Sequence, residues 1–374
     1  SSLVGSEMCI RDSLSLYVLP MFGNKAKLVL LSVMLGTCLV SMFLADIPTA
    51  LIFFGICSPL LEKNSCEPGK SNFGKALMLG IPVGAALGGI GTPAGSGMNA
   101  VTMSLLKSIC GVEISFAQWS IVGVPVAIVS LVLAWLFLCL VFKPEINVVK
   151  GLDSLKDDRK NLPPLRSSEL RFTIVFAVMV VMWFVPKKIG IDMYMTTWLG
   201  IFVMSLPGMD MVDWKEMNGR IDWSAILICG AATALATVVA NLGTGAWLSG
   251  ILANLFLSRV AGMGLLVLLL VINIMMMVGH YPMPQGVSLA GLCLPVVGAL
   301  ALDLGLNPIA VCLPVCMSTS MLLLVPIDPT CYTTYSGGYW KIKDMMSTGV
   351  VITLGYVVVC SVWTAVVAGI GLLG

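Results

Sequence analysis

The chain has 374 residues, of which 58% are apolar and only 11% are charged. An average soluble domain has about 25% charged residues, so this composition excludes an ordinary soluble protein and indicates one that is surrounded by a lipid bilayer. The net charge of +2 gives no sign of a nucleic-acid partner, and twelve cysteines with a single histidine do not suggest a metal site or another cofactor.

Residues 1–13 (SSLVGSEMCIRDS) differ in character from the rest of the chain. They lack the apolar core of a signal peptide and do not begin a membrane span. We therefore interpret them as a non-native leader, and the fold prediction starts at residue 14.

The first apolar segments predict a hairpin, a broken helix and a full span. Segment 28–61 is too long for one span of about 20 residues, and its centre carries a carboxylate, Asp46, followed by a proline. We predict a re-entrant hairpin of two half-depth helices, whose polar tip must be satisfied by protein or water. Segment 73–107 is interrupted by the sequence GGIGTPAGSGMN, where glycine and proline favour unwinding. A continuous span is predicted over 117–142.

The same order recurs after a charged linker, 143–169, that we place in the cytoplasm. Three apolar segments come first, followed by a hairpin, a broken helix and a span. These segments are 170–186, 194–209 and 223–240, then the hairpin 263–302, the broken helix 307–335, whose predicted interruption is 325–334, and the span 346–373.

The repeated order predicts two structural repeats, a partial one over 14–142 and a second over 170–374. If each hairpin returns to the face from which it starts, most lysines and arginines lie on one face, which marks the cytoplasm. The two repeats are then inverted relative to each other. Three helices of the second repeat have no counterpart in the first, so we expect the chain to be truncated at its N-terminus.

Interrupted helices at corresponding places in two halves indicate the binding site of a secondary transporter. A carboxylate within a membrane is costly, so Asp46 is expected to bind a cation or proton, or to cap the second half-helix of its hairpin. Asp328 is its counterpart in the second half. Thr49 follows Asp46, while His280 and Gln285 occupy the second tip, either as proton or substrate contacts or as groups that satisfy the hairpin itself.

The two breaks supply oxygen donors that suit a sodium ion, beside half-helix N-termini that suit an anion. In the first break these donors are Thr92, Ser96 and Asn99, and the second break offers Thr330 and Thr333. Close packing of small residues is the alternative explanation for both sets.

Three sequence features resemble the divalent-anion:sodium symporter family of the ion-transporter superfamily. They are the segment Ser41-Met42-Phe43-Leu44, the GGIGTPAGSGMN break and the ending YSGGYWKI, and the similarity extends over most of the chain from about residue 24. The resemblance implies an elevator-type carrier, usually a homodimer in the bacterial inner membrane, that moves dicarboxylates, citrate or sulfate with sodium. It places sodium near Asp46, Gly95 and Asn99. The family's Ser-Asn-Thr tip motifs correspond here to Ala45-Asp46-Ile47 and Gln285-Gly286-Val287.

We therefore predict an all-α, multi-pass membrane protein that is not an enzyme. Its predicted function is symport of a small anion, a di- or tricarboxylate or sulfate, with sodium or alternatively with protons. The large membrane subunit of a binding-protein-dependent (TRAP-type) dicarboxylate transporter and a passive anion channel are the alternatives. An intramembrane aspartyl protease would need Asp46 and Asp328 a few ångströms apart.

Overall fold

The computed structural model describes residues 18–152, 167–184, 193–206, 262–281, 286–321 and 329–373, with a few isolated positions between 218 and 260. The regular structure of this part of the chain is helical, apart from one isolated antiparallel bridge between Lys25 and Val148. The predicted all-α fold is thereby confirmed. The predicted leader, most of the predicted span 223–240, and the candidate residues Gln285 and Asp328 lie outside the described residues.

The first long apolar segment folds back on itself. Helices α2 (Ala26–Ser41) and α3 (Asp46–Lys63) are joined by a short tip. The outer ends of both helices are hydrogen-bonded to the segment that follows α6 (Phe116–Val141). The Ala26 amide donates to the Asn147 carbonyl at 3.1 Å, and the Asn64 side chain exchanges hydrogen bonds with the backbone of Lys150 at 2.8 and 3.1 Å. The two arms therefore start and end at the same end of the molecule.

The next segment is a helix broken near its middle. Helix α4 (Asn72–Gly89) begins at Ser71, whose hydroxyl caps it by accepting from the Gly74 amide at 2.9 Å. Helix α5 (Gly97–Cys110) begins after the break and ends at a left-handed glycine, a common helix terminator. The predicted interruption thus lies between residues 90 and 96.

The second broken helix is interrupted earlier than the sequence predicts. Helix α16 (Pro308–Ser318) ends just before Thr319, and α17 (Pro329–Tyr335) follows. The predicted break, 325–334, is therefore wrong at its C-terminal end, because residues 329–334 belong to helix α17, which starts at Pro329. Proline at the first position of a helix lacks only an amide that has no helical partner there, so it starts a helix instead of breaking one.

Two long helices cross the middle of the body. Among the described residues, α6 (Phe116–Val141) and α18 (Ile342–Gly369) are the helices long and apolar enough to span a membrane, judged by length and composition. The Gln118 side chain donates to the Leu373 carbonyl at 3.2 Å, so the start of α6 lies beside the end of α18. The two helices are therefore antiparallel.

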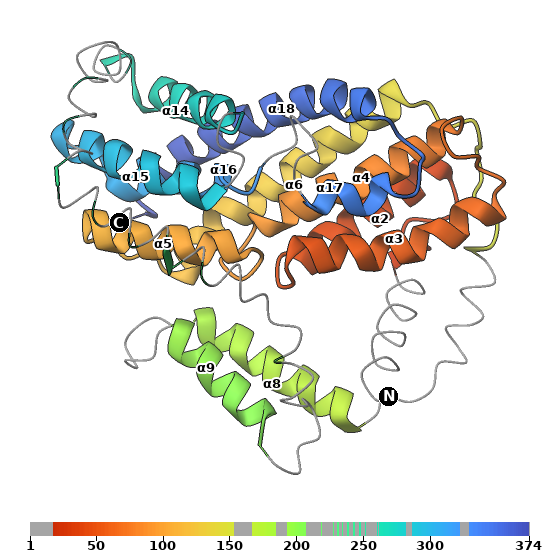
Figure 1. Ribbon diagram of the computed structural model, residues 1–374, viewed down its shortest axis with the longest axis horizontal. Coiled ribbons are helices and arrows are strands. Elements are labelled where there is room, and N and C mark those ends of the chain that lie inside the picture. Colours follow the sequence, from red (N-terminus) through yellow and green to blue (C-terminus); the bar gives the residue numbers. More distant parts are fainter. Residues whose placement is uncertain are drawn as a thin grey trace.

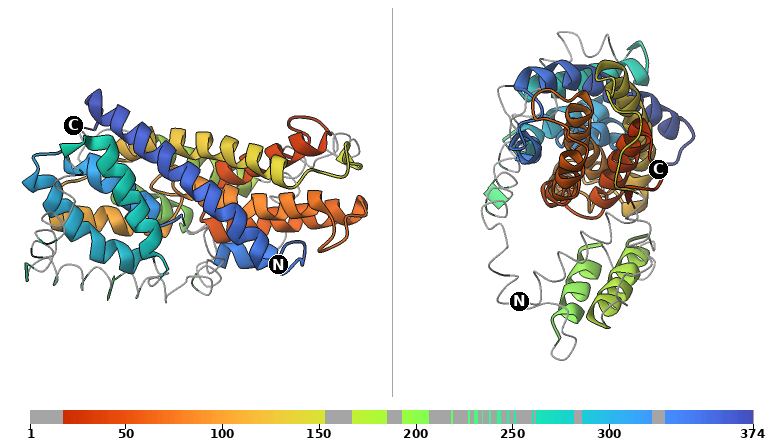
Figure 2. Two further views of the ribbon diagram at one scale, coloured as in Figure 1. Left: turned by 90° about the horizontal axis from the view of Figure 1, so that it is seen from above. Right: turned by 90° about the vertical axis from the view of Figure 1, so that its right-hand side faces the viewer.

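Helices α8 (Ser167–Phe184) and α9 (Met193–Met204) pack on each other and lie below the other helices in Figure 1 and in the right-hand view of Figure 2. Aromatic contacts connect them to the body. The ring of Phe116 lies 5.3 Å from that of Trp183 and 4.8 Å from that of Phe184. These helices cover most of the predicted spans 170–186 and 194–209.

The second hairpin segment contains α14 (Leu265–Gly279) and α15 (Gly286–Asp303), which lie at the opposite end of the body from α2 and α3 (Figure 1). Packing in one half has a counterpart in the other: α2 against α4 matches α14 against α16, and α2 against α6 matches α14 against α18. The second half of each broken helix packs against the hairpin of the other half of the chain: α5 packs on α15, and α17 packs on α3. This pattern is the one that an inverted repeat would produce; the repeat boundaries stay predictions.

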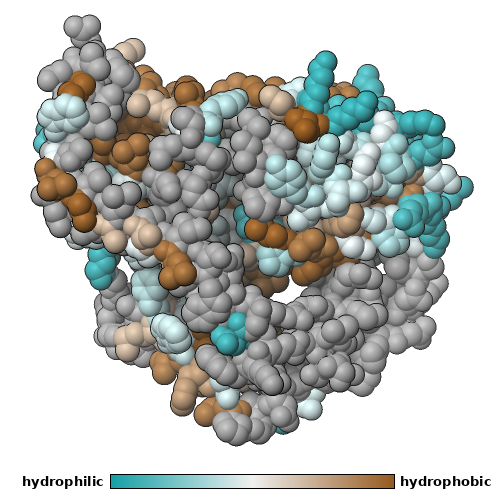
Figure 3. Space-filling view, in the orientation of Figure 1, coloured by the Kyte–Doolittle hydropathy of each residue, from teal (hydrophilic) through white to brown (hydrophobic). Residues whose placement is uncertain are grey.

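The described surface is polar at one end and largely apolar elsewhere. In Figure 3 hydrophilic side chains gather at the end that carries the start of α4 and the start of α18. Exposed charged residues there include Lys63, Lys70, Lys143, Lys150 and Lys343. The rest of the visible described surface carries many large apolar side chains, as a surface facing lipid would.

At this polar end Glu145 holds the start of α4. Its carboxylate accepts from the Ser71 hydroxyl and from the Phe73 amide, the latter at 2.9 Å. Partial burial raises the pKa of the Glu145 carboxyl, but these hydrogen bonds outweigh it and leave the pKa below the ordinary value of 4.5. The carboxylate form is therefore the one that the folded protein stabilises.

Replacing Glu145 with glutamine is expected to lower thermal stability in detergent by about 1 kcal/mol at pH 7. Because the folded pKa is depressed, this contribution is present above pH 4.5 and is lost as the pH falls through the lower folded value. Melting curves of both proteins between about pH 7 and about pH 4 test this, because that interval includes the ordinary carboxyl pKa at which the loss begins. A stability difference that does not shrink on acidification would contradict it.

Candidate functional site

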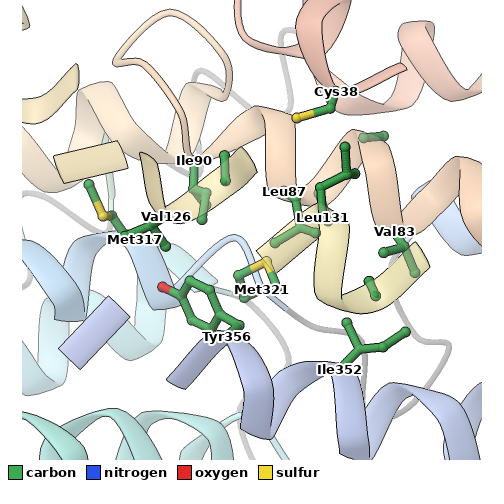
Figure 4. Packing of buried hydrophobic residues seen from close by; sticks show 14 of the residues in the cluster. Cys38, Val83, Leu87, Ile90, Val126, Leu131, Met317, Met321, Ile352 and Tyr356 are labelled. Carbon is green, nitrogen blue, oxygen red and sulfur yellow. The ribbon is translucent and has the colours of Figure 1, made fainter. Parts of the chain in front are cut away.

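The two helix breaks meet in the middle of the molecule. The Ser320 hydroxyl, in the second break, points to the side-chain oxygen of Asn99 at 3.5 Å, across 221 residues of sequence. Apolar residues from both halves pack around this place. Figure 4 shows Ile90 of the first break near Met317 and Met321 of the second half, with Tyr356 of α18 beside them. The polar groups of the breaks therefore lie inside a packed core.

Asn99 holds the first break in its unwound form. Its side-chain amide donates to the carbonyl of Gly89 at 2.7 Å and to the carbonyl of Thr92 at 2.9 Å. Asn99 is fully buried. One side chain thus donates to two carbonyls of the break, in a buried place where an unsatisfied carbonyl would be costly; the Thr92 carbonyl also accepts from the Gly95 amide at 3.2 Å.

The tip of the first hairpin lies directly on this break. The Thr92 hydroxyl donates to the Met42 carbonyl, and the Ser41 hydroxyl donates to the Ala85 carbonyl of α4 at 2.8 Å. Gly95 permits the closest approach, because a Cβ there would lie 2.8 Å from the Ser41 carbonyl oxygen. Hairpin tip and break are consequently one packed unit.

The second half repeats this arrangement with different residues. The His280 Nε2 lies 3.0 Å from the Ser318 carbonyl, so a protonated Nε2 donates to the end of α16. A Cβ on Gly286, at the start of α15, would lie 2.4 Å from the Thr319 carbonyl oxygen. The second hairpin therefore also lies against the break of its own half.

Helix α6 also packs against the first break. The indole N–H of Trp119 donates to the Ile90 carbonyl at 2.9 Å. Gly123 lies so close that an added Cβ would be 2.6 Å from the carbonyl oxygens of both Ile90 and Gly91. Several carbonyl oxygens of the unwound segment are thus held in fixed positions by surrounding helices.

The structure places the carboxylate of Asp46 differently from the capping role considered above. The N-cap of α3 is Ala45, and Asp46 is the first helical residue, with its Oδ1 accepting from the Ile47 amide at 3.1 Å. Asp46 is half-buried in the first turn of α3, where the helix dipole stabilises its negative charge. The neighbouring Thr49 is fully buried, with its hydroxyl 3.5 Å from the Leu44 carbonyl.

Three of the other predicted residues make hydrogen bonds within their own helices. Ser96 is the N-cap of α5 and accepts from the Met98 amide at 3.3 Å. Thr330 and Thr333 lie within α17, where the Thr333 hydroxyl donates to the Thr330 carbonyl at 2.7 Å. The structure thus brings Thr92, Ser96 and Asn99 together at one break, while Thr330 and Thr333 lie on a helix that packs against α3 and α4.

Sequence reasoning missed buried polar residues beside the tips and breaks, among them Ser41, Ser318, Thr319 and Ser320, and it also missed Asn273, midway along α14. A signal exists for the last, because Asn273 is the one amide in the apolar run LLVLLLVINIMMMVG. Thr319 and Ser320 belong to a small polar cluster, Ser-Thr-Ser, that ends α16. Ser41 begins the segment Ser41-Met42-Phe43-Leu44 that resembles the symporter family, but its residue type alone gives no signal, since serines recur throughout the apolar helices.

Comparison with known proteins identifies the family of the chain. A family profile described as the sodium:sulfate symporter transmembrane region matches residues 8–370. The chain belongs to this family. The family resemblance inferred from the sequence is thereby confirmed, and membership makes the chain an integral membrane protein of a transporter family.

The relatives of this chain include sodium-dependent dicarboxylate transporters named SdcS. The protein from Staphylococcus saprophyticus is 24% identical over 375 residues, which cover 94% of this chain and 71% of that protein. The protein from Staphylococcus aureus strain USA300 is 24% identical over 365 residues, covering 91% and 69% respectively. Among solved structures, the YdaH transporter of Alcanivorax borkumensis has the same fold, with a TM-score of 0.57 and 14% identity over 98% of this chain and 84% of that one.

Proposed function

We propose that this chain is a sodium-coupled symporter of a small dianion, with C4 dicarboxylates as the first candidate substrates. The observation that carries the proposal is the meeting of the two breaks at Asn99 and Ser320, with a hairpin tip against each break. Unwound helices at corresponding places are where secondary transporters bind their substrates and coupling ions. Membership of the symporter family and the named activity of the SdcS relatives support sodium and a dicarboxylate.

The first break has the chemistry of a sodium site. Asn99 directs its side-chain oxygen toward Ser320, and the unwound backbone around Gly95 offers carbonyl oxygens, the hard donors that a small cation prefers. Asp46 adds a negative charge in the adjoining hairpin. We assign the cation to this region and the anion to the positive N-terminal end of α5, where Ser96 caps the helix.

The second break provides a parallel set of oxygens. Thr319 and Ser320 follow the end of α16 and are buried, and Thr330 lies at the start of α17. We propose that this region, with Gln285, Asp328 and Thr333, contacts the substrate or a second cation. His280 donates to the Ser318 carbonyl beside it, and it is the group through which protons would replace sodium as coupling ion. We also propose that the carrier works as a homodimer.

Uptake of labelled succinate by proteoliposomes tests the proposal. We expect accumulation above equilibrium when a sodium gradient is imposed, and none when choline replaces sodium or an ionophore dissipates the gradient. An imposed proton gradient, without sodium, is the second arm. Accumulation driven only by protons would overturn sodium coupling, and equilibration without accumulation under either gradient would indicate a passive channel.

A further inference from the structure

A buried hydrogen-bond network lies beside the second break and is separate from the residues assigned above to ions and substrate. Its centre is Asn273, midway along the apolar helix α14. The Ser318 hydroxyl donates to the Asn273 Oδ1 at 2.8 Å, and the Asn273 amide donates to the Ser361 hydroxyl oxygen at 2.9 Å. The hydroxyls of Ser318 and Tyr356 lie 3.3 Å apart. The network thus joins α14, α16 and α18.

The network is fully enclosed. Asn273, Ser318, Ser361 and Tyr356 are each 0% exposed. Inside a protein, an amide that lacks partners costs more than its hydrogen bonds contribute when made, so a buried network of this kind holds its members in one arrangement. Apolar side chains would fill the same space without fixing how far α14 and α16 slide past each other.

The position of Ser318 connects this network to the break. Ser318 is the last residue of α16, and the unwound residues Thr319 and Ser320 follow at once. Its hydroxyl belongs to the network, while its carbonyl accepts from His280 at the start of the second tip. The end of α16 is therefore fixed from two sides, by α14 and by the hairpin tip.

We propose that Asn273 is a positioning residue for the second break, whose oxygens we assign to a second cation. Through Ser318 it fixes where α16 ends, and so sets the place of the oxygens of Thr319 and Ser320 without touching ion or substrate itself. This inference rests on the proposed function. It predicts that weakening the network raises the sodium concentration needed for half-maximal uptake, while the succinate KM at saturating sodium stays close to that of the wild type.

Ser361→Ala is the variant that tests this, because it removes one partner of Asn273 and changes little volume. Ser130→Ala is the matched control: Ser130 lies on α6, is 2% exposed, and its hydroxyl has no hydrogen-bond partner among the described residues. We expect the half-maximal sodium concentration to rise about fivefold in Ser361→Ala, as the loss of one buried hydrogen bond would produce, and to stay unchanged in Ser130→Ala. Asn273→Leu should give a larger rise.

Hydrogen exchange provides a readout that does not depend on transport. Amides of 308–321 should exchange faster in Ser361→Ala than in wild type, and should not change in Ser130→Ala. Equal exchange and equal sodium dependence in all three proteins would overturn the positioning role. If the wild type fails to accumulate succinate while exchange still rises in Ser361→Ala, the proposed function is wrong and the role of Asn273 in fixing α16 stands.

Discussion

Replacing Gly95 with alanine is expected to reduce sodium-driven uptake at least about tenfold. An added Cβ would lie 2.6 Å from the Gly89 carbonyl oxygen and 2.8 Å from the Ser41 carbonyl oxygen. Both are backbone atoms, so no side-chain rotation relieves the clash. Either the first break or the tip of the first hairpin must move, and the oxygens that both present to the ion move with it.

The neighbouring Gly97 supplies a closely matched control. It lies two residues further on, at the start of α5, and a Cβ there would meet no atom within 4 Å. Gly97→Ala should therefore transport like the wild type, since alanine also suits a helix better than glycine. The measurement is the initial uptake rate of each variant and of the wild type, at equal amounts of reconstituted protein. Equal loss in both variants would show that the tip-to-break contact has no special importance.

The hairpin and break architecture was predictable because it depends on local properties of the sequence. Apolar segments too long for one span, with an aspartate or a histidine near the centre, predict a helix that turns back. The first break was placed well because five glycines and a proline crowd its twelve-residue sequence GGIGTPAGSGMN. The second was placed too late, because Pro329 looks like a helix breaker in the sequence but begins α17 in the structure.

The contacts that assemble the site were not predictable in the same way. Ser320 reaches Asn99 across 221 residues, and Asn273 reaches Ser361 across 88. Hydropathy and periodicity describe one helix at a time and contain no information about which polar groups of distant helices meet. The side chain of Asp46 illustrates the same limit at short range: a shift of one residue in the start of α3 converts a cap into a first-turn charge.

The second large effect is expected at Asn99. Removing its side chain in Asn99→Ala takes the side-chain donor from the Gly89 carbonyl and leaves the Thr92 carbonyl with only the Gly95 amide, at 3.2 Å, in a fully buried place. Two lost buried hydrogen bonds are expected to destabilise the protein by about 2–4 kcal/mol and to let the break rearrange. Sodium-driven uptake should fall at least about tenfold, together with a lower melting temperature in detergent.

Asn72→Ala separates this effect from the general cost of losing an asparagine. Asn72 is exposed at the polar end of α4, and its amide donates to the Lys143 carbonyl at 3.3 Å. Since water can replace that bond, uptake and melting temperature should change little. If Asn99→Ala melts at a lower temperature yet keeps the sodium dependence and uptake rate of the wild type, Asn99 stabilises the break without shaping an ion site. The cation would then have to be placed at the second break, where Thr319 and Ser320 provide the oxygens.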